Sequence, residues 1–144
     1  MIRPATLDEV DRLIELGEAL HRESSYASLS FNREKARAKI TECITTGFCV
    51  VFEREGLAQG YMGGTVAAPW FSDDLMGVEY SLYVAPQYRG GRETIRMIAA
   101  WAHWCKGEGA VQLRPGITTG NMAAIRLYER MGFKVQGVTL CKEC

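Results

Sequence analysis

The 144-residue sequence contains no apolar run close to the roughly 20 residues that a membrane-spanning helix needs, and it lacks the charged-then-apolar start of a secretion signal. It also lacks an excess of charge, because 17 Lys and Arg residues balance 17 Asp and Glu residues. A neutral chain has no overall attraction for nucleic acid or for anionic membranes. These absences predict a cytoplasmic protein with no nucleic-acid or membrane partner.

Cysteine occurs at only five scattered positions, and an odd number of this kind fits reduced thiols better than a disulfide framework. Cys141 and Cys144 form one Cys-x-x-Cys pair. A structural zinc site of this type needs a second such pair, and a redox pair precedes a helix, which this one does not. We therefore expect no metal site and interpret the pair as part of an ordinary tail.

The residues that are present favour one globular domain over residues 1–144, since 47% of them are apolar and 24% are charged. Helical spacing of apolar residues and capping signals predict helices over residues 7–22, 32–46, 92–106 and 121–132. Alternation and turn signals predict strands over residues 2–4, 48–52, 57–68, 78–84 and 110–114, and the residues after Phe133 leave room for one more over residues 134–141. The order β-α-α-β-β-β-α-β-α-β predicts an α/β (α+β) fold, with a mixed, mostly antiparallel sheet flanked by four helices.

The strand over residues 78–84 alternates in polarity, so that Glu79 shares one predicted face with Ser81 and Tyr83. It leads into a turn with two adjacent glycines, Gly90 and Gly91, and then into an apolar helix. A helix start presents unpaired N–H groups and a partial positive charge, and glycine lets a ligand approach the backbone closely. The turn therefore suits phosphate, with Arg89 and Arg92 as mobile positive charges beside it.

A second motif covers residues 121–133, a short helix that begins after an N-cap at Asn121 and ends before Gly132. Together with the turn at residues 88–91 and the opening residues 2–6, it resembles the GCN5-related N-acetyltransferase (GNAT) family over essentially the whole chain. The resemblance implies an N-acetyltransferase that moves an acetyl group from acetyl-CoA to a primary amine. It implies direct attack in a ternary complex, with no metal and no covalent enzyme intermediate.

The same resemblance implies the position of the co-substrate. The pyrophosphate would lie on the glycine turn, where Arg92 and Thr94 stand at positions that are usually glycine or a small residue. The pantetheine arm would pair with the strand before it like an extra strand. The implied binding residues are Leu82, Tyr83, Val84, Arg89, Gly90, Gly91, Arg92, Glu93, Thr94, Asn121, Ala124 and Tyr128.

For the chemistry, the resemblance implies that Tyr128 protonates the departing thiolate and that Glu79 takes a proton from the amine, directly or through water. A carboxylate with an ordinary pKa is a poor base for an ammonium group unless burial raises that pKa. His21, near the expected acceptor cleft, and His103 are the rival bases. The structural alternatives are that Tyr128 is only a core residue and that Glu79 is only a surface charge.

Two features bear on the acceptor and on assembly. The loop from Trp70 to Asp74 joins aromatic residues to two carboxylates, which suits a cationic acceptor amine and is equally typical of a charged surface turn. Eleven residues follow Phe133, enough for one strand where the family usually has two. We expect a homodimer that covers the resulting sheet edge. A non-catalytic acyl-CoA-binding protein and a partner-blocking protein of the same fold remain alternatives.

Overall fold

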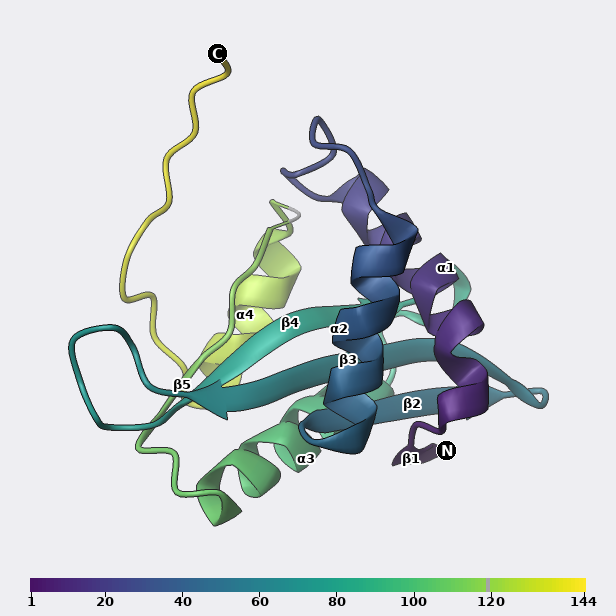
Figure 1. Cartoon of the computed structure of the whole chain (residues 1–144), viewed down its shortest axis with the longest axis horizontal. Coiled ribbons are helices and arrows are strands. Elements are labelled where there is room, and N and C mark those ends of the chain that lie inside the picture. The colour runs from purple at the N-terminus through teal and green to yellow at the C-terminus, as the bar shows by residue number, and fades with distance from the viewer. Residues whose placement is uncertain (119) are drawn as a thin grey trace.

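The computed structural model describes residues 1–118 and 120–144 (Figure 1). Along the chain the elements are β1 (Ile2–Pro4), α1 (Val10–Glu23), α2 (Arg33–Thr45), β2 (Phe48–Arg54), β3 (Leu57–Ala67), β4 (Met76–Val84), α3 (Glu93–Gly107), β5 (Gln112–Arg114) and α4 (Met122–Arg130). Short 3-10 turns precede α1 at Leu7–Glu9 and α3 at Pro86–Tyr88. The predicted elements up to residue 132 are thus present with small shifts of their ends.

The five strands form one sheet in the order β1-β2-β3-β4-β5, and the pairs from β1 to β4 are antiparallel. The turn between β2 and β3 has positive φ at both central residues, 57° at Glu55 and 75° at Gly56, which matches the twist of a tight hairpin. β5 pairs parallel to β4, with α3 as the connection between them. This confirms the mixed, mostly antiparallel sheet and its four helices.

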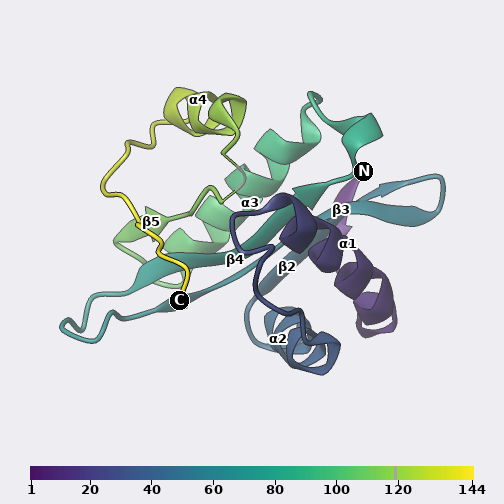
Figure 2. The ribbon, with the colours of Figure 1, turned by 90° about the horizontal axis from the view of Figure 1, so that it is seen from above.

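The sheet lies between two helical layers, α1 and α2 on one face and α3 and α4 on the other (Figure 2). Each layer buries its own apolar cluster against the strands. On the α3 side the fully buried Trp101 packs against two glycines of the sheet. A Cβ atom at Gly64 would lie 2.5 Å from the carbonyl oxygen of Val78 and 2.8 Å from Trp101 Nε1, and one at Gly77 would lie 2.7 Å from Leu113 Cδ2 and 3.2 Å from the Trp101 ring. Neither position has room for a side chain beside the indole and its neighbours.

The caps predicted from the sequence are confirmed. The side chain of Asn32 accepts from the backbone N–H of Lys35 at 3.0 Å, and that of Asn121 accepts from Ala123 at 2.9 Å. After α4, Gly132 has a φ of 94°, a left-handed conformation that favours glycine at a helix end. None of the helices in the described part of the chain is long and apolar enough to cross a membrane.

The last predicted strand is wrong, because residues 134–141 form no strand and pair with no neighbour in the sheet. The tail runs away from α4 in extended form (Figure 1), and Val138 and Leu140 are 83% and 88% exposed. The adjacent strand β5 is only three residues long, so it offers few backbone groups for a further ladder. Sufficient length alone therefore does not produce a strand here.

Candidate functional site

A β-bulge in β4 decides which way Glu79 faces. Ser81 and Glu79 oppose consecutive glycines of β3, so Tyr80 between them has no partner in the ladder. The extra residue inverts the alternation, and Glu79 lies on the same face as Leu82 rather than with Ser81 and Tyr83. The glycine opposite Glu79 points toward Trp101 of α3, whereas the preceding one points toward the side chains of Ser81 and Cys43, on the α2 side. The predicted face of Glu79 is therefore wrong.

The edge of β4 is open beyond the point where β5 leaves it. The parallel pairing with β5 ends at Val78, and among the described residues no other strand lies on this edge. Ala85 donates its backbone N–H to Gln59 of β3 at 2.8 Å. Because backbone groups alternate in direction along a strand, those of Val84 and Leu82 point to the open edge. The divergence on which the pantetheine interpretation depends is thus present.

A pocket of about 390 Å³ lies at this opening and holds both predicted catalytic residues. Tyr128 enters it from α4; its side chain is 6% exposed and its ring meets Phe133 edge-on at 5.2 Å. Glu79 enters from β4 and accepts a hydrogen bond from the backbone N–H of Gly116 at 3.2 Å. Ala124, one turn before Tyr128, also lines the pocket.

The pocket changes the acidity of both groups. Burial raises the pKa of Glu79 from its ordinary value of 4.5 to about 7, and the hydrogen bond from Gly116 opposes that rise. Burial also raises the pKa of Tyr128, and the nearby charge of Glu79 adds to the effect. At neutral pH the site therefore contains a carboxylate that readily exchanges a proton and a phenol that keeps its own.

The glycine turn is open to solvent, but it carries a negative charge. Gly90 has a φ of 89°, and nothing lies within 4 Å of the position that a Cβ atom would take there. α3 begins at Glu93, and Arg92 at its N-cap makes no side-chain cap bond. The carboxylate of Glu93 bends back over Gly91, where it would collide with a Cβ atom. The turn thus offers a helix N-terminus with a carboxylate beside it, and Thr94 follows in the first helical turn.

Arg89 is not the mobile charge that the sequence predicts. Its Nε donates to the carbonyl oxygen of Val84 at 2.7 Å, and its two terminal nitrogens donate to the carboxylate of Glu23 at 3.1 and 2.9 Å. The guanidinium also lies 5.1 Å from the centre of the Tyr83 ring. These contacts hold the pKa of Glu23 below its usual range. Sequence reasoning missed Glu23, because nothing local links it to a residue 66 positions away.

The structure separates the two histidines from the pocket. His21, at the end of α1, packs against Phe31 at 5.4 Å between ring centres, and its Nε2 is buried without a partner among the described residues. His103 lies on α3 and lines a different groove. Neither is among the residues that line the pocket, so Glu79 is the one of the three candidate bases found there.

Residues 14–133 match the model of the Acetyltransferase (GNAT) family. A possible acetyltransferase from Clostridium difficile has a similar structure, with a TM-score of 0.74 and 16% identity over 99% of this chain and 95% of that one. Glucosamine-6-phosphate N-acetyltransferase from Arabidopsis thaliana gives 0.73 and 17%, over 99% and 97% of the two chains. The aminoglycoside N-acetyltransferase AAC(6')-Iy in complex with CoA gives 0.71 and 14%, over 100% of both. No curated protein has a sequence that matches significantly.

Proposed function

Because this chain belongs to the GNAT acetyltransferase family, we propose that it transfers the acetyl group of acetyl-CoA to a primary amine by direct attack in a ternary complex. The observation that carries the proposal is the meeting of Glu79 and Tyr128 in one pocket beside the open edge of β4. A carboxylate with a raised pKa and a protonated phenol are the two groups that this reaction needs.

The open edge of β4 fits the pantetheine arm of the co-substrate. The backbone of Leu82 and the N–H of Val84 face the opening, with Tyr83 between them facing β3, and an extended arm can pair there like an added strand. Arg89 already occupies the carbonyl oxygen of Val84. The N–H of Val84 remains for the thioester oxygen, where it would stabilise the negative charge that develops during attack.

The phosphates would meet the turn before α3, and here the fit is poorer. Gly90 leaves open space and the helix start supplies N–H groups, but Glu93 brings negative charge over Gly91. Arg92 is the cation next to this carboxylate in the chain, and Thr94 adds a hydroxyl. We infer that Arg92 supplies positive charge to the phosphates and that the nearby carboxylate of Glu93 offsets it. At the other end of the arm, Asn121 caps α4 and Ala124 lines the pocket.

Glu79 acts as the general base on the amine. An alkylamine has a pKa near 10, so most of it is protonated at neutral pH and an ordinary carboxylate accepts its proton poorly. A carboxylate with a pKa of about 7 is closer in basicity to the amine and is still half ionised at neutral pH. The proton moves to Glu79 directly or through one water molecule.

Tyr128 acts on the leaving sulfur. Because burial keeps the phenol protonated, it is available as a donor when negative charge collects on the departing thiolate. The thiol of CoA has a pKa near 8.5, and a phenol held at hydrogen-bond distance stabilises its thiolate. The sulfur takes the phenol proton as its bond to the acetyl carbon breaks.

The test is release of free CoA from acetyl-CoA in the presence of a panel of primary amines, with the acetylated product identified by mass spectrometry. Glu79→Gln and Tyr128→Phe should each reduce release strongly. Glu108→Gln, which changes an exposed carboxylate at the end of α3, is the matched control and should leave the rate unchanged. Amine-dependent release that persists undiminished in both site variants would refute the assigned roles.

A non-catalytic acyl-CoA-binding protein of the same fold is the second candidate, and the open edge of β4 supports it as well, because binding of the pantetheine arm needs that edge and not the two groups in the pocket. Acetyl-CoA should raise the melting temperature of either protein, because a ligand that binds the native state stabilises it. Thermal stabilisation without turnover of any amine would support this candidate over the enzyme. Dephospho-CoA and acetyl-pantetheine should stabilise progressively less, and equal stabilisation by acetyl-pantetheine would show that the turn binds no phosphate.

A further inference from the structure

The loop between β3 and β4 carries two exposed aromatic side chains. It projects beyond the end of the sheet (Figure 1), and at its tip Trp70 is 97% exposed and Phe71 is 72% exposed. The two rings meet edge-on with 5.5 Å between their centres. Aromatic side chains gathered on a surface in this way are typical of an interaction site, because Trp and Phe contribute large apolar areas to interfaces.

The residues that follow the aromatic pair are acidic. Asp73 and Asp74 are exposed, and neither makes an ion pair with any residue in the described part of the chain. Two unpaired carboxylates next to the rings disfavour docking to an anionic lipid surface, because like charges repel. They favour a surface that combines an apolar hollow with positive charge.

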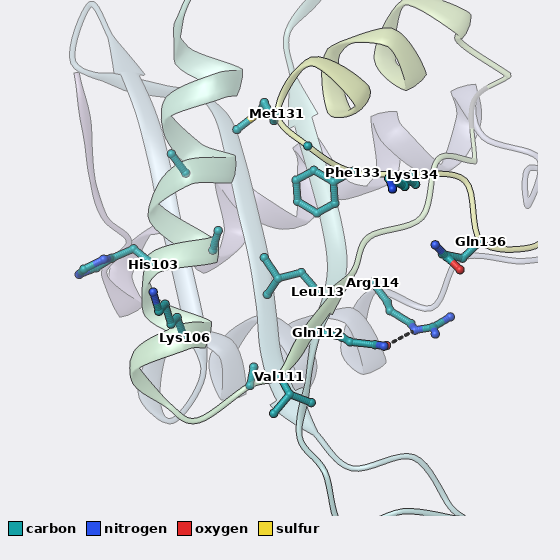
Figure 3. A pocket seen from close by; sticks show the side chains of 14 residues that line it. His103, Lys106, Val111, Gln112, Leu113, Arg114, Met131, Phe133, Lys134 and Gln136 are labelled. Atoms are coloured by element: carbon teal, nitrogen blue, oxygen red, sulfur yellow. Dashed lines mark hydrogen bonds between the residues drawn. The ribbon is translucent and has the colours of Figure 1, made fainter.

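Such a surface is present on the same chain. A groove of about 880 Å³ lies between α3, β5 and the segment that follows α4. In the close view of it (Figure 3), Leu113 and Phe133 point into the space between α3 and that segment. Lys106 lies at the α3 side and Lys134 at the opposite side (Figure 3), and neither forms an ion pair with another described residue. The groove is thus apolar inside and basic at its rim.

We infer that two copies of this chain associate by inserting the Trp70–Phe71 tip of each into the groove of the other. The apolar tip meets the apolar groove while Asp73 and Asp74 meet its basic rim, so shape and charge agree. A two-fold arrangement uses both tips and both grooves. At about 150–250 Å² for each aromatic side chain, the four rings bury about 600–1,000 Å². With a similar area lost from the grooves, the total reaches that of a stable protein interface.

Sedimentation equilibrium over a range of concentrations tests this association. The wild-type chain should form dimers, and the double variant Trp70→Ser/Phe71→Ser should raise the dimer dissociation constant by more than about 30-fold, as expected for loss of central aromatic anchors. The matched control is Leu57→Ser, an exposed apolar residue beside the β2–β3 turn, which should not change association. All three substituted residues are exposed, so the variants should fold, and circular dichroism and a melting curve check this.

A charge exchange makes the test specific for this pairing. Asp73→Lys/Asp74→Lys and Lys106→Glu/Lys134→Glu should each weaken self-association. An equimolar mixture of the two variants should restore a mixed complex, because each tip then meets a groove rim of opposite charge.

Four results would overturn the inference. The first is a wild-type chain that stays monomeric at all concentrations, which would mean that the tip binds another partner or the groove of its own chain. The second is a dimer that survives the loss of both aromatic residues. The third is a dimer that Val138→Lys dissociates while the tip variant does not, which would assign the contact to the exposed tail. A mixture of charge variants that fails to associate would likewise count against this pairing.

Discussion

Replacing Glu79 with Gln should remove most of the turnover and at the same time stabilise the fold above pH 7. The two effects have one origin, the burial that raises the pKa of this carboxyl from 4.5 to about 7. The amide of Gln is nearly the same size and can accept the hydrogen bond from Gly116 N–H, but it carries no charge and takes no proton. The substitution therefore separates the charge of the side chain from its packing.

The activity follows from the ionised fraction of Glu79. With a pKa of about 7, only about a tenth of the carboxyl is ionised at pH 6, so the wild-type rate should fall about tenfold for each pH unit below 7. The Gln variant should be slower by about 10²-fold to 10⁴-fold near pH 8, the usual range for loss of a general base. Its profile should lack the limb with an apparent pKa near 7. Steady-state rates from pH 5.5 to 9 measure both.

The stability follows from linkage. Because the folded-state pKa lies above the unfolded one, the native protein binds more protons between pH 4.5 and 7, and its stability falls as the pH rises through that window. The full cost above pH 7 is at most about 3 kcal/mol, and because the accessible surface of Glu79 shows it only partly buried, solvent reduces this to about 1–2 kcal/mol. The Gln variant avoids this cost, so its Tm should exceed that of the wild type by about 2–6 °C at pH 8 and by nothing at pH 4.5.

A Gln variant with the wild-type pH profile would refute the base role, and one that is less stable than the wild type at pH 8 would refute the burial on which the raised pKa depends. The two measurements are independent. A loss of rate without the gain in stability would indicate damage to the pocket rather than loss of a charged base. Glu108→Gln serves as the control in both, since that carboxylate is exposed.

Tyr128→Phe should lower turnover by about 10²-fold while the melting temperature changes little, because the ring and its packing remain; an unchanged rate would make Tyr128 a core residue. Gly64→Ala should cost about 1–3 kcal/mol in thermal unfolding, since its Cβ would lie 2.8 Å from Trp101 Nε1, whereas Gly137→Ala has open space and should be neutral; equal effects would contradict the packing argument. Gly90→Val should reduce the melting shift that acetyl-CoA produces, and it should also destabilise the free protein by about 1–2 kcal/mol, because a φ of 89° strains any residue with a Cβ atom.

Most of the fold could be predicted because its signals are local. Asn32 and Asn121 mark the starts of their helices, and Glu55 and Gly56 mark a tight turn. Each of these is decided by residues within one turn of the chain, so the sequence pattern alone specifies it. The same holds for the Tyr128 helix, whose apolar face predicts the side that packs inward.

The errors arise where distant segments decide the outcome. The ion pair of Arg89 with Glu23 joins residues far apart in the sequence, and no local pattern announces it. Residues 134–141 are long enough for a final strand, but β5 beside them is only three residues long and offers few backbone groups to pair with. The side chain of Glu93 over Gly91 likewise depends on a rotamer that spacing does not encode.

The bulge at Tyr80 is the most consequential of these distant effects, because it couples two requirements of the site. An unbroken ladder would direct Glu79 to the α1–α2 face, away from Tyr128 and from the strand edge that β5 leaves open. A bulge also increases the local twist of its strand, which carries the end of β4 away from a straight neighbour. One extra residue thus aims the carboxylate at the pocket and favours the opening beside it. Its position depends on pairing with Gly63 and Gly64, so the alternation of β4 read alone gives Glu79 the opposite face.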